Sequence, residues 1–85
     1  MTLLIDVRTP EEYAAGHIEG AVNITGDDLI KGNLGALMNV EQDSPIQLYC
    51  RSGGRSEAVK AQLQVIGFSN VTNLGGQEDA KKAIL

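Results

Sequence analysis

Short apolar runs alternate with polar or glycine-containing stretches along the chain. The first run, at residues 3–7, has no polar alternation, which is typical of a strand buried on both faces of a parallel sheet. The run at residues 46–50 is the clearest strand, and two shorter runs predict strands at residues 21–24 and 70–74. The sequence therefore predicts a small, mostly parallel sheet.

The first helix is predicted from its start signal. Thr9 suits the N-cap position, Pro10 the first helical position, and Glu12 completes a capping box. Gly16 then closes a short helix that runs through residue 15.

A weaker helical pattern follows the second predicted strand. Gly32 and Gly35 interrupt it, and each glycine lowers helix propensity by about 1 kcal/mol relative to alanine. We therefore expect a short or broken helix there, followed by a polar turn at residues 41–45. The apolar positions that would share its buried face are Leu29, Ile30, Leu34, Leu37 and Met38.

The strongest helix follows the strand at residues 46–50. We expect it to begin near Ser56, to bury Val59, Leu63 and Ile66 on one face, and to end at Gly67. A pair of glycines at positions 75 and 76 predicts a turn into a last helical segment from Gln77. Strands that alternate with helices indicate an α/β domain with helices on both faces of the sheet.

Size and composition fit one domain over residues 1–85. A chain of 85 residues can bury only a modest core, and 42% apolar residues without tryptophan imply a core of aliphatic side chains. No apolar run approaches the length of a membrane span, so we expect no membrane partner. Nothing in the sequence demands more than a monomer.

The charge balance limits the classes of binding partner that we expect. A formal charge of −4 with seven basic residues does not predict a basic surface that would bind nucleic acid. Arg51 and Arg55, however, flank a pair of glycines and form a local basic site in an acidic protein. Small anions are therefore the expected ligands.

Cys50 is the one cysteine, which excludes an internal disulfide and a site with several cysteine ligands. We expect no metal and no cofactor. Cys50 ends a predicted parallel strand, where the reactive sites of such sheets lie. Six residues, Cys50 through Arg55, separate this strand from the predicted helix. Their glycines allow several N–H groups to turn inward and bind an anion.

This setting predicts a reactive thiol. Helix N-terminal amides and the guanidinium groups of Arg51 and Arg55 would lower the pKa of Cys50. The one histidine, His17, lies on another loop and is expected to be structural, so a Cys–His protease arrangement has no local support. Four residues separate Cys50 from Arg55, one fewer than in the loops of cysteine phosphatases, and a shorter cradle suits one extra sulfur atom better than a phosphoryl group.

Some roles in this loop remain open. Arg55 could pair with Glu12 or Glu57 on the surface, and Arg51 could be solvated, so Arg55 is the stronger candidate of the two. Ser56 could donate a hydrogen bond to a sulfur oxyanion, but we expect it to cap its helix.

Three motifs, in order, resemble the rhodanese family over nearly the whole chain. Residues 5–13 (IDVRTPEEY) and 16–24 (GHIEGAVNI) resemble its N-terminal signature, and residues 49–56 (YCRSGGRS) resemble its active-site loop. Gly67, Phe68, Val71, Leu74 and the glycine pair are similar to its closing segment. The resemblance implies the three-layer rhodanese-like fold.

The resemblance also implies a function, thiosulfate sulfurtransferase activity through a Cys50 persulfide. The sulfur would pass to cyanide or to a thiol acceptor, for example a thioredoxin-like protein. Asp6 and Arg8 would support the site from beneath, with Arg8 paired to Glu12 across the first helical turn. The substrate-binding residues would be Arg51, Ser52, Gly53, Gly54, Arg55 and Ser56.

Two other functions fit the same residues. One is a persulfide carrier or regulatory module that needs the same cradle but turns over thiosulfate poorly. The other is a cysteine phosphatase or arsenate reductase on the same fold. The position of Arg55, one residue closer to the cysteine than in phosphatase loops, argues against this second function.

The cellular location stays open at this point. No basic segment followed by a long apolar stretch opens the chain. Met1 and Thr2 adjoin the first predicted strand directly, as in a protein trimmed of its signal peptide. We expect the periplasm for such a trimmed form and the cytoplasm otherwise.

Overall fold

The computed structural model describes residues 2–51 and 54–84. Strands and helices alternate through these residues, as the hydrophobic pattern predicts. The elements are β1 (Leu3–Asp6), α1 (Pro10–Ala15), β2 (Val22–Asn23), α2 (Gly26–Ile30), the 3-10 helix η1 (Gly35–Asn39), β3 (Ile46–Cys50), α3 (Gly54–Val65), β4 (Val71–Gly76) and α4 (Gln77–Ile84). Among the described helices, none has the length and apolar character that a bilayer crossing requires.

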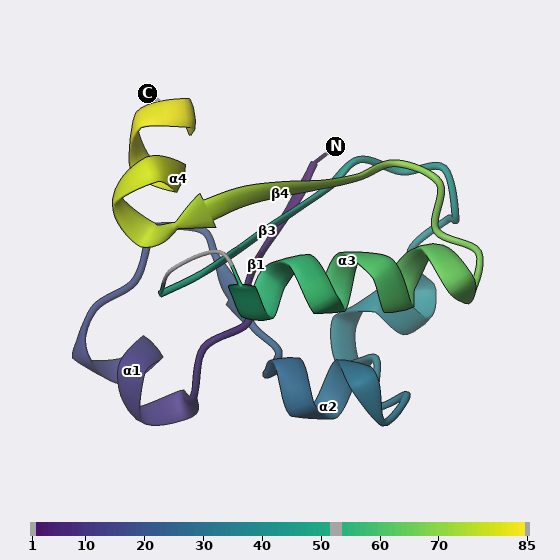
Figure 1. Ribbon diagram of the computed structural model, residues 1–85, viewed down its shortest axis with the longest axis horizontal. Helices are drawn as coiled ribbons and strands as arrows, with labels where there is room; N and C mark the ends of the chain where they lie inside the picture. Colours follow the sequence, from purple (N-terminus) through teal and green to yellow (C-terminus); the bar gives the residue numbers. More distant parts are fainter. Residues whose placement is uncertain (1, 52–53, 85) are drawn as a thin grey trace.

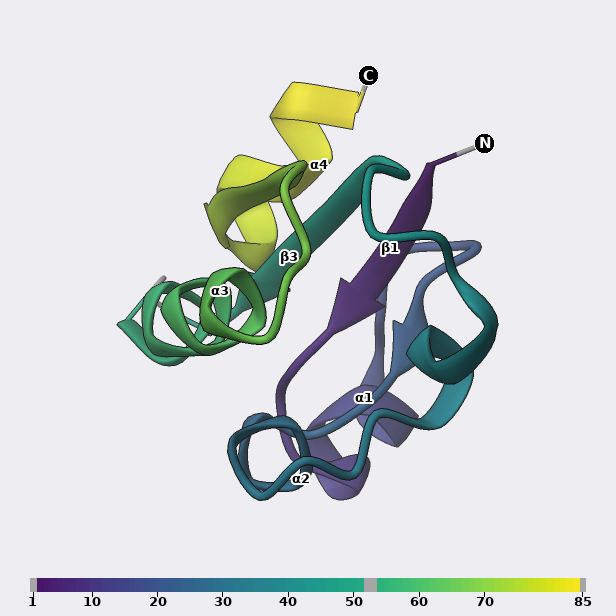
Figure 2. The same cartoon turned by 90° about the vertical axis from the view of Figure 1, so that its right-hand side faces the viewer.

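The described strands form one sheet in the order β2-β1-β3-β4, and each neighbouring pair is parallel. At its centre, β1 and β3 lie side by side, with Leu3 opposite Ile46 and Asp6 opposite Tyr49 (Figure 2). This arrangement confirms the predicted parallel α/β fold. All carboxyl ends of the strands consequently point to the same edge of the sheet.

Helices cover both faces of the sheet, as predicted (Figure 1). Alternate residues of a strand point to opposite faces. On β3, Leu48 and Cys50 join the larger apolar cluster, which includes Leu63 of α3, whereas Tyr49 joins a smaller cluster with Ala80 of α4. Figure 1 shows α2 and α3 on the right and α1 and α4 on the left. The site at the end of β3 thus lies between two packed layers.

The start of α1 confirms the predicted capping box. Thr9 Oγ1 accepts a hydrogen bond from the Glu12 backbone N–H at 3.2 Å, and Glu12 Oε1 accepts from the Thr9 N–H at 3.0 Å. Pro10 occupies the first turn, and the helix ends before Gly16. The cap therefore fixes Glu12 near the carboxyl end of β1.

The weak helical pattern is broken, as expected, into α2 and η1. Gly32 between them has a φ of 91°, a conformation that glycine adopts without strain. The predicted common face is wrong in part: Leu29 and Leu37 are buried, but Ile30 and Met38 are 48% and 75% exposed. The turn between the two segments reorients the second one, so that a single 3.6-residue period does not span both.

The predicted start of α3 is also wrong, because the helix begins at Gly54 and not near Ser56. Ser56 is a buried residue inside the first turn, so it does not cap the helix. Ile66 lies beyond the helix end and is 37% exposed, in contrast to the buried Val59 and Leu63.

The expected turn at the second glycine pair is wrong too. Gly75 and Gly76 are the last residues of β4, and α4 begins directly at Gln77. Gly75 has a φ of 91°, so it provides the bend within the end of the strand that the sequence pattern assigned to a separate turn.

Candidate active site

The candidate site lies where the strand order changes direction. From β1 the chain goes to β2 on one side, and from β3 it goes to β4 on the other. In open parallel sheets such a switch point, at the carboxyl ends of the strands, is where ligands bind. Cys50 is the last residue of β3 and Arg8 follows β1, so both belong to this edge. The position of Cys50 is the one that its strand-end motif predicts.

The connection from β3 to α3 is shorter than the sequence suggested. Since α3 begins at Gly54, this residue and Arg55 belong to the helix and not to the loop. Arg51 is exposed immediately after the strand. Ser52 and Gly53, both predicted to bind substrate, lie outside the described residues.

Cys50 has a fully buried side chain and a polar neighbour in the first turn of α3. The Ser56 hydroxyl lies 3.4 Å from Cys50 Sγ, and it also lies 2.6 Å from Asn73 Oδ1. Ser56 is itself fully buried. The arrangement therefore sets a hydroxyl against the sulfur on which a reaction would occur.

Asn73, on β4, holds that hydroxyl from the other side. Its Oδ1 accepts from Ser56 and from the Gly75 N–H at 2.9 Å, while its Nδ2 donates to Glu57 Oε2 at 3.0 Å. Sequence reasoning missed Asn73, because it lies 17 residues from Ser56 and belongs to no local motif. Its polar side chain in a predicted strand was the one available signal.

Arg55 contacts Glu12 at the rim of the site. Its Nη1 and Nη2 both lie 3.3 Å from Glu12 Oε1, and the two side chains are 45% and 27% exposed. This is one of the two surface pairs that the sequence left open. The hydrogen bond from the Thr9 N–H, and then that from Arg55, lowers the pKa of Glu12. Glu12 is thus an ionised partner of Arg55, and an anionic ligand could take its place.

Beneath the site, Asp6 and Arg8 form a buried ion pair. Arg8 Nη2 lies 2.8 Å from Asp6 Oδ2, and Arg8 Nε donates to both carboxylate oxygens at 3.0 and 3.1 Å. The predicted pairing of Arg8 with Glu12 is wrong, because in this part of the chain Asp6 lies two residues away on the same side and Glu12 is committed to the helix cap. The Asp6 hydrogen bond raises the pKa of Arg8, against the opposing effect of burial.

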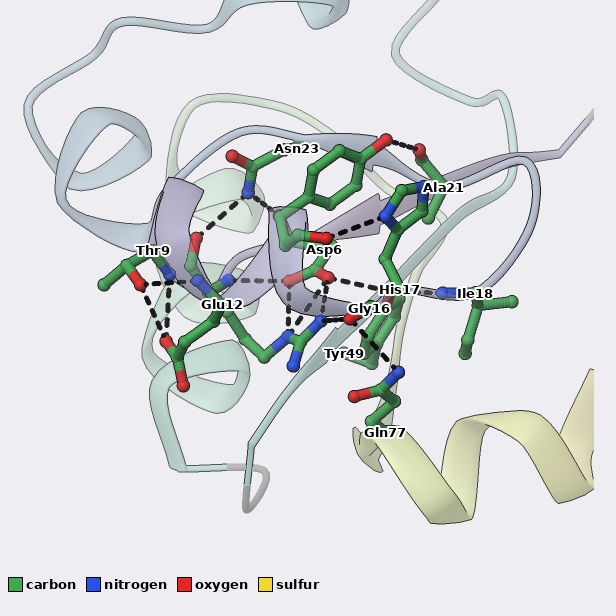
Figure 3. A network of polar contacts seen from close by, with 12 residues as sticks. Asp6, Thr9, Glu12, Gly16, His17, Ile18, Ala21, Asn23, Tyr49 and Gln77 are labelled. Carbon is green, nitrogen blue, oxygen red and sulfur yellow. Dashed lines mark hydrogen bonds and ion pairs between the residues drawn. The ribbon is translucent and has the colours of Figure 1, made fainter.

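This ion pair connects three parts of the chain (Figure 3). Arg8 Nη2 donates to the Gly16 carbonyl oxygen at 2.6 Å, beyond the end of α1. Tyr49 donates to Asp6 Oδ2 at 2.8 Å and accepts from the Ile18 N–H at 3.1 Å. Burial, together with the bond to Asp6, raises the pKa of Tyr49 to about 12. The sequence placed Tyr49 in the strand and at the start of the loop motif but assigned it no role, whereas in the structure it anchors the strand that ends at the neighbouring cysteine.

His17 belongs to the surface of the α1 region. Its ring stacks on Tyr13 with 3.6 Å between centroids, and Nδ1 lies 2.8 Å from the Tyr13 carbonyl oxygen. Because that oxygen can only accept, Nδ1 carries a proton. Both contacts are those of a structural histidine.

The comparisons with known proteins give a consistent family. A family model described as "Rhodanese-like domain" matches residues 1–83. The thiosulfate sulfurtransferase PspE of Escherichia coli is 35% identical over 75 residues, which cover 88% of this chain and 70% of PspE. The thiosulfate sulfurtransferase GlpE of Pseudomonas entomophila is 34% identical over 74 residues, which cover 87% of this chain and 64% of GlpE.

Solved structures agree with the sequence relatives. A structure described as "rhodanese with anions from E. coli" has a TM-score of 0.82 at 32% identity, over 93% of this chain and 91% of its own. The human single-domain sulfurtransferase TSTD1 has a TM-score of 0.77 at 25% identity, over 95% of this chain and 81% of its own. Sequence motifs, sheet order and these likenesses lead to the same conclusion: the chain belongs to the rhodanese-like domain family.

Proposed function

We propose that this protein is a thiosulfate sulfurtransferase that carries a sulfane sulfur on Cys50 and transfers it to cyanide or to a thiol. The observation that carries the proposal is the place of Cys50, at the end of β3, at the switch point of the sheet and against the Ser56 hydroxyl. Family membership and relatives named thiosulfate sulfurtransferase support the sulfurtransferase class.

In the first step, the Cys50 thiolate attacks the outer sulfur of thiosulfate. A sulfur–sulfur bond forms at Cys50 Sγ, the sulfur–sulfur bond of thiosulfate breaks, and sulfite leaves with the bonding electron pair. One thiolate and one dianion become a persulfide anion and a sulfite dianion, so charge is conserved. No general base is needed once the thiol is ionised.

In the second step, an acceptor attacks the outer sulfur of the persulfide. Cyanide leaves as thiocyanate and regenerates the Cys50 thiolate, whereas a thiol acceptor, such as that of a thioredoxin-like protein, would leave as a persulfide. The enzyme thus alternates between two covalent states, which predicts ping-pong kinetics.

The anionic donor would bind at residues 51–56, which comprise Arg51, Ser52, Gly53, Gly54, Arg55 and Ser56. Arg55 is available for this, because its contact with Glu12 is an exposed pair of the kind that stabilises by less than about 1 kcal/mol. Guanidinium groups and the first amides of α3 would stabilise the negative charge that moves from Cys50 to the departing sulfite. The protein would do this as a monomer.

The test is the intact mass of the protein before thiosulfate, after thiosulfate and after cyanide. We expect a gain of about 32 Da that cyanide removes, as a covalent sulfur relay requires. Cys50→Ser is the matched control, since it replaces the thiol by a hydroxyl of similar size and removes the nucleophilic sulfur, and it should gain nothing. If the wild-type protein takes up no sulfur, thiosulfate is not its donor and the proposal fails.

A second candidate is a persulfide carrier, which the complete burial of Cys50 favours, since an enclosed sulfur exchanges slowly with solutes. Such a carrier would gain the same mass but release about one thiocyanate per chain, whereas an enzyme would release many under steady-state conditions. The phosphatase alternative has less support, because α3 begins at Gly54 and leaves a still shorter connection for a phosphoryl group.

A further inference from the structure

The Ser56 hydroxyl has only one proton to give, and it lies within reach of both Asn73 and Cys50. Asn73 Oδ1 lies at 2.6 Å and Cys50 Sγ at 3.4 Å. A carbonyl oxygen carries no hydrogen, so in the shorter contact Ser56 must be the donor. With its proton on Asn73, the hydroxyl presents a lone pair to Cys50, to which a neutral thiol can donate but which a thiolate cannot use.

The orientation of the Asn73 amide is fixed by its other contacts. Nδ2 donates to the Glu57 carboxylate at 3.0 Å, and Oδ1 accepts from the Gly75 N–H at 2.9 Å. A flipped amide would put its oxygen against a carboxylate and its NH₂ against a backbone donor. The contacts of both amide atoms therefore agree that the acceptor, Asn73 Oδ1, is the atom that faces Ser56.

We propose that Asn73 is a positioning residue that acts through Ser56: it competes with Cys50 for the Ser56 proton and so sets how readily the thiol ionises. The proposal deepens the proposed function, because Cys50 is the nucleophile there, but it describes the thiol before any substrate binds.

The competition gives the hydroxyl two positions in the reaction. While Cys50 is a thiol, Ser56 donates to Asn73. When the thiol loses its proton to water, the hydroxyl rotates and donates to the sulfur anion, and Asn73 Oδ1 keeps the Gly75 N–H. Once Cys50 carries a second sulfur, the charge lies on the outer atom and the hydroxyl returns to Asn73. Before substrate binds, the Cys50 thiolate is therefore less favourable than it would be if Asn73 did not compete for the Ser56 proton.

The experiment measures the pH profile of Cys50, by its rate of alkylation with iodoacetamide and by the ultraviolet absorbance of the thiolate. Asn73→Leu removes the competing acceptor, and the midpoint should fall by about one pH unit, the effect of one hydrogen bond to a charged group. Asn73→Asp keeps the acceptor and adds negative charge, so the midpoint should rise. Asn70→Leu is the matched control, because Asn70 precedes the other end of β4, and it should not move the midpoint.

A second pair of variants separates this role from a structural one. In a Ser56→Ala protein the shared proton is gone, so adding Asn73→Leu should leave the midpoint unchanged. A shift of the same size in the Ser56→Ala background, or no shift in the Ser56-containing protein, would overturn the proposal. Should Asn73→Leu fold poorly, the opposite shift in Asn73→Asp, and its loss without Ser56, decide the question.

Neither readout uses thiosulfate. Failure of the sulfur uptake test with a normal response to Asn73→Leu would refute the proposed donor alone. Normal sulfur uptake with no response to Asn73→Leu would refute the positioning role alone.

Discussion

Removing the charge of Asp6 tests what the buried ion pair does for stability. Asp6 is fully buried, and its carboxylate accepts from the backbone and guanidinium of Arg8 and from Tyr49 at 2.8–3.1 Å. Asp6→Asn preserves the shape but leaves the Arg8 guanidinium, on a side chain that is only 9% exposed, without a counter-charge. The new NH₂ group also faces donors.

The expected loss is large for so small a protein. Breaking one side of a buried ion pair costs about 3–5 kcal/mol. A folded chain of 85 residues has a total stability of roughly 4–13 kcal/mol, from the usual value per residue. Asp6→Asn should therefore remove about a quarter or more of the free energy of unfolding. For a domain of this size the melting temperature should fall by more than about 10 °C.

Urea unfolding followed by circular dichroism measures this loss. Glu78→Gln is the control, since Glu78 forms an exposed ion pair with Lys81 at 3.4 Å that should stabilise by less than about 0.5 kcal/mol. Adding Arg8→Met to Asp6→Asn removes the unpaired cation, so the double variant should lose less than the sum of the two single variants by about 2 kcal/mol or more. A loss below about 1 kcal/mol for Asp6→Asn, or additive losses, would refute the reasoning.

Three further measurements test separate features. Because the pKa of Tyr49 is raised from 10.0 to about 12, the folded state keeps this proton longer than the unfolded state, and stability should fall as the pH rises through that window; urea unfolding of Tyr49→Phe should lack this fall. Because the pKa of Glu12 is lowered, its contribution is present above about pH 4.5 and lost as the pH falls through the lowered pKa; thermal melts of Glu12→Gln should show less acid sensitivity, and an unchanged profile would contradict this. Leu63→Ala should cost about 2–5 kcal/mol in urea because Leu63 is fully buried, whereas Val65→Ala, at a 79% exposed position of the same helix, should cost less than about 0.5 kcal/mol.

Patterns between neighbouring residues predicted most of the fold. The capping box depends on Thr9 and Glu12, three positions apart, and the strand that ends at Cys50 depends on five consecutive residues. The start of α3 escaped prediction, because glycine at position 54 disfavours a helix by itself, while packing of the helix against β3 and β4 outweighs that preference. Propensity is local, but helix ends are decided by packing.

The contacts of the site depend on residues far apart in the sequence. Tyr49 reaches Asp6 across 43 residues, and Ser56 reaches Asn73 across 17. No periodic pattern carries that information, since both pairs meet only when parallel strands come together. The strand end and the glycines identified Cys50 as a candidate, but the residue that holds Ser56 could be found only in three dimensions.

The pairing of β1 with β3 also has a consequence for how the chain folds. Leu3 lies opposite Ile46, so the central pair of the sheet joins residues that are synthesised far apart in time. Until β3 leaves the ribosome, β1 can pair only with the two residues of β2, and its other edge stays open. Such long-range parallel pairing is slow to form, and open strand edges favour aggregation in the meantime. Of the four strands in this sheet, β1 is thus made before the others, yet both of its edges are covered only after β3 has been made.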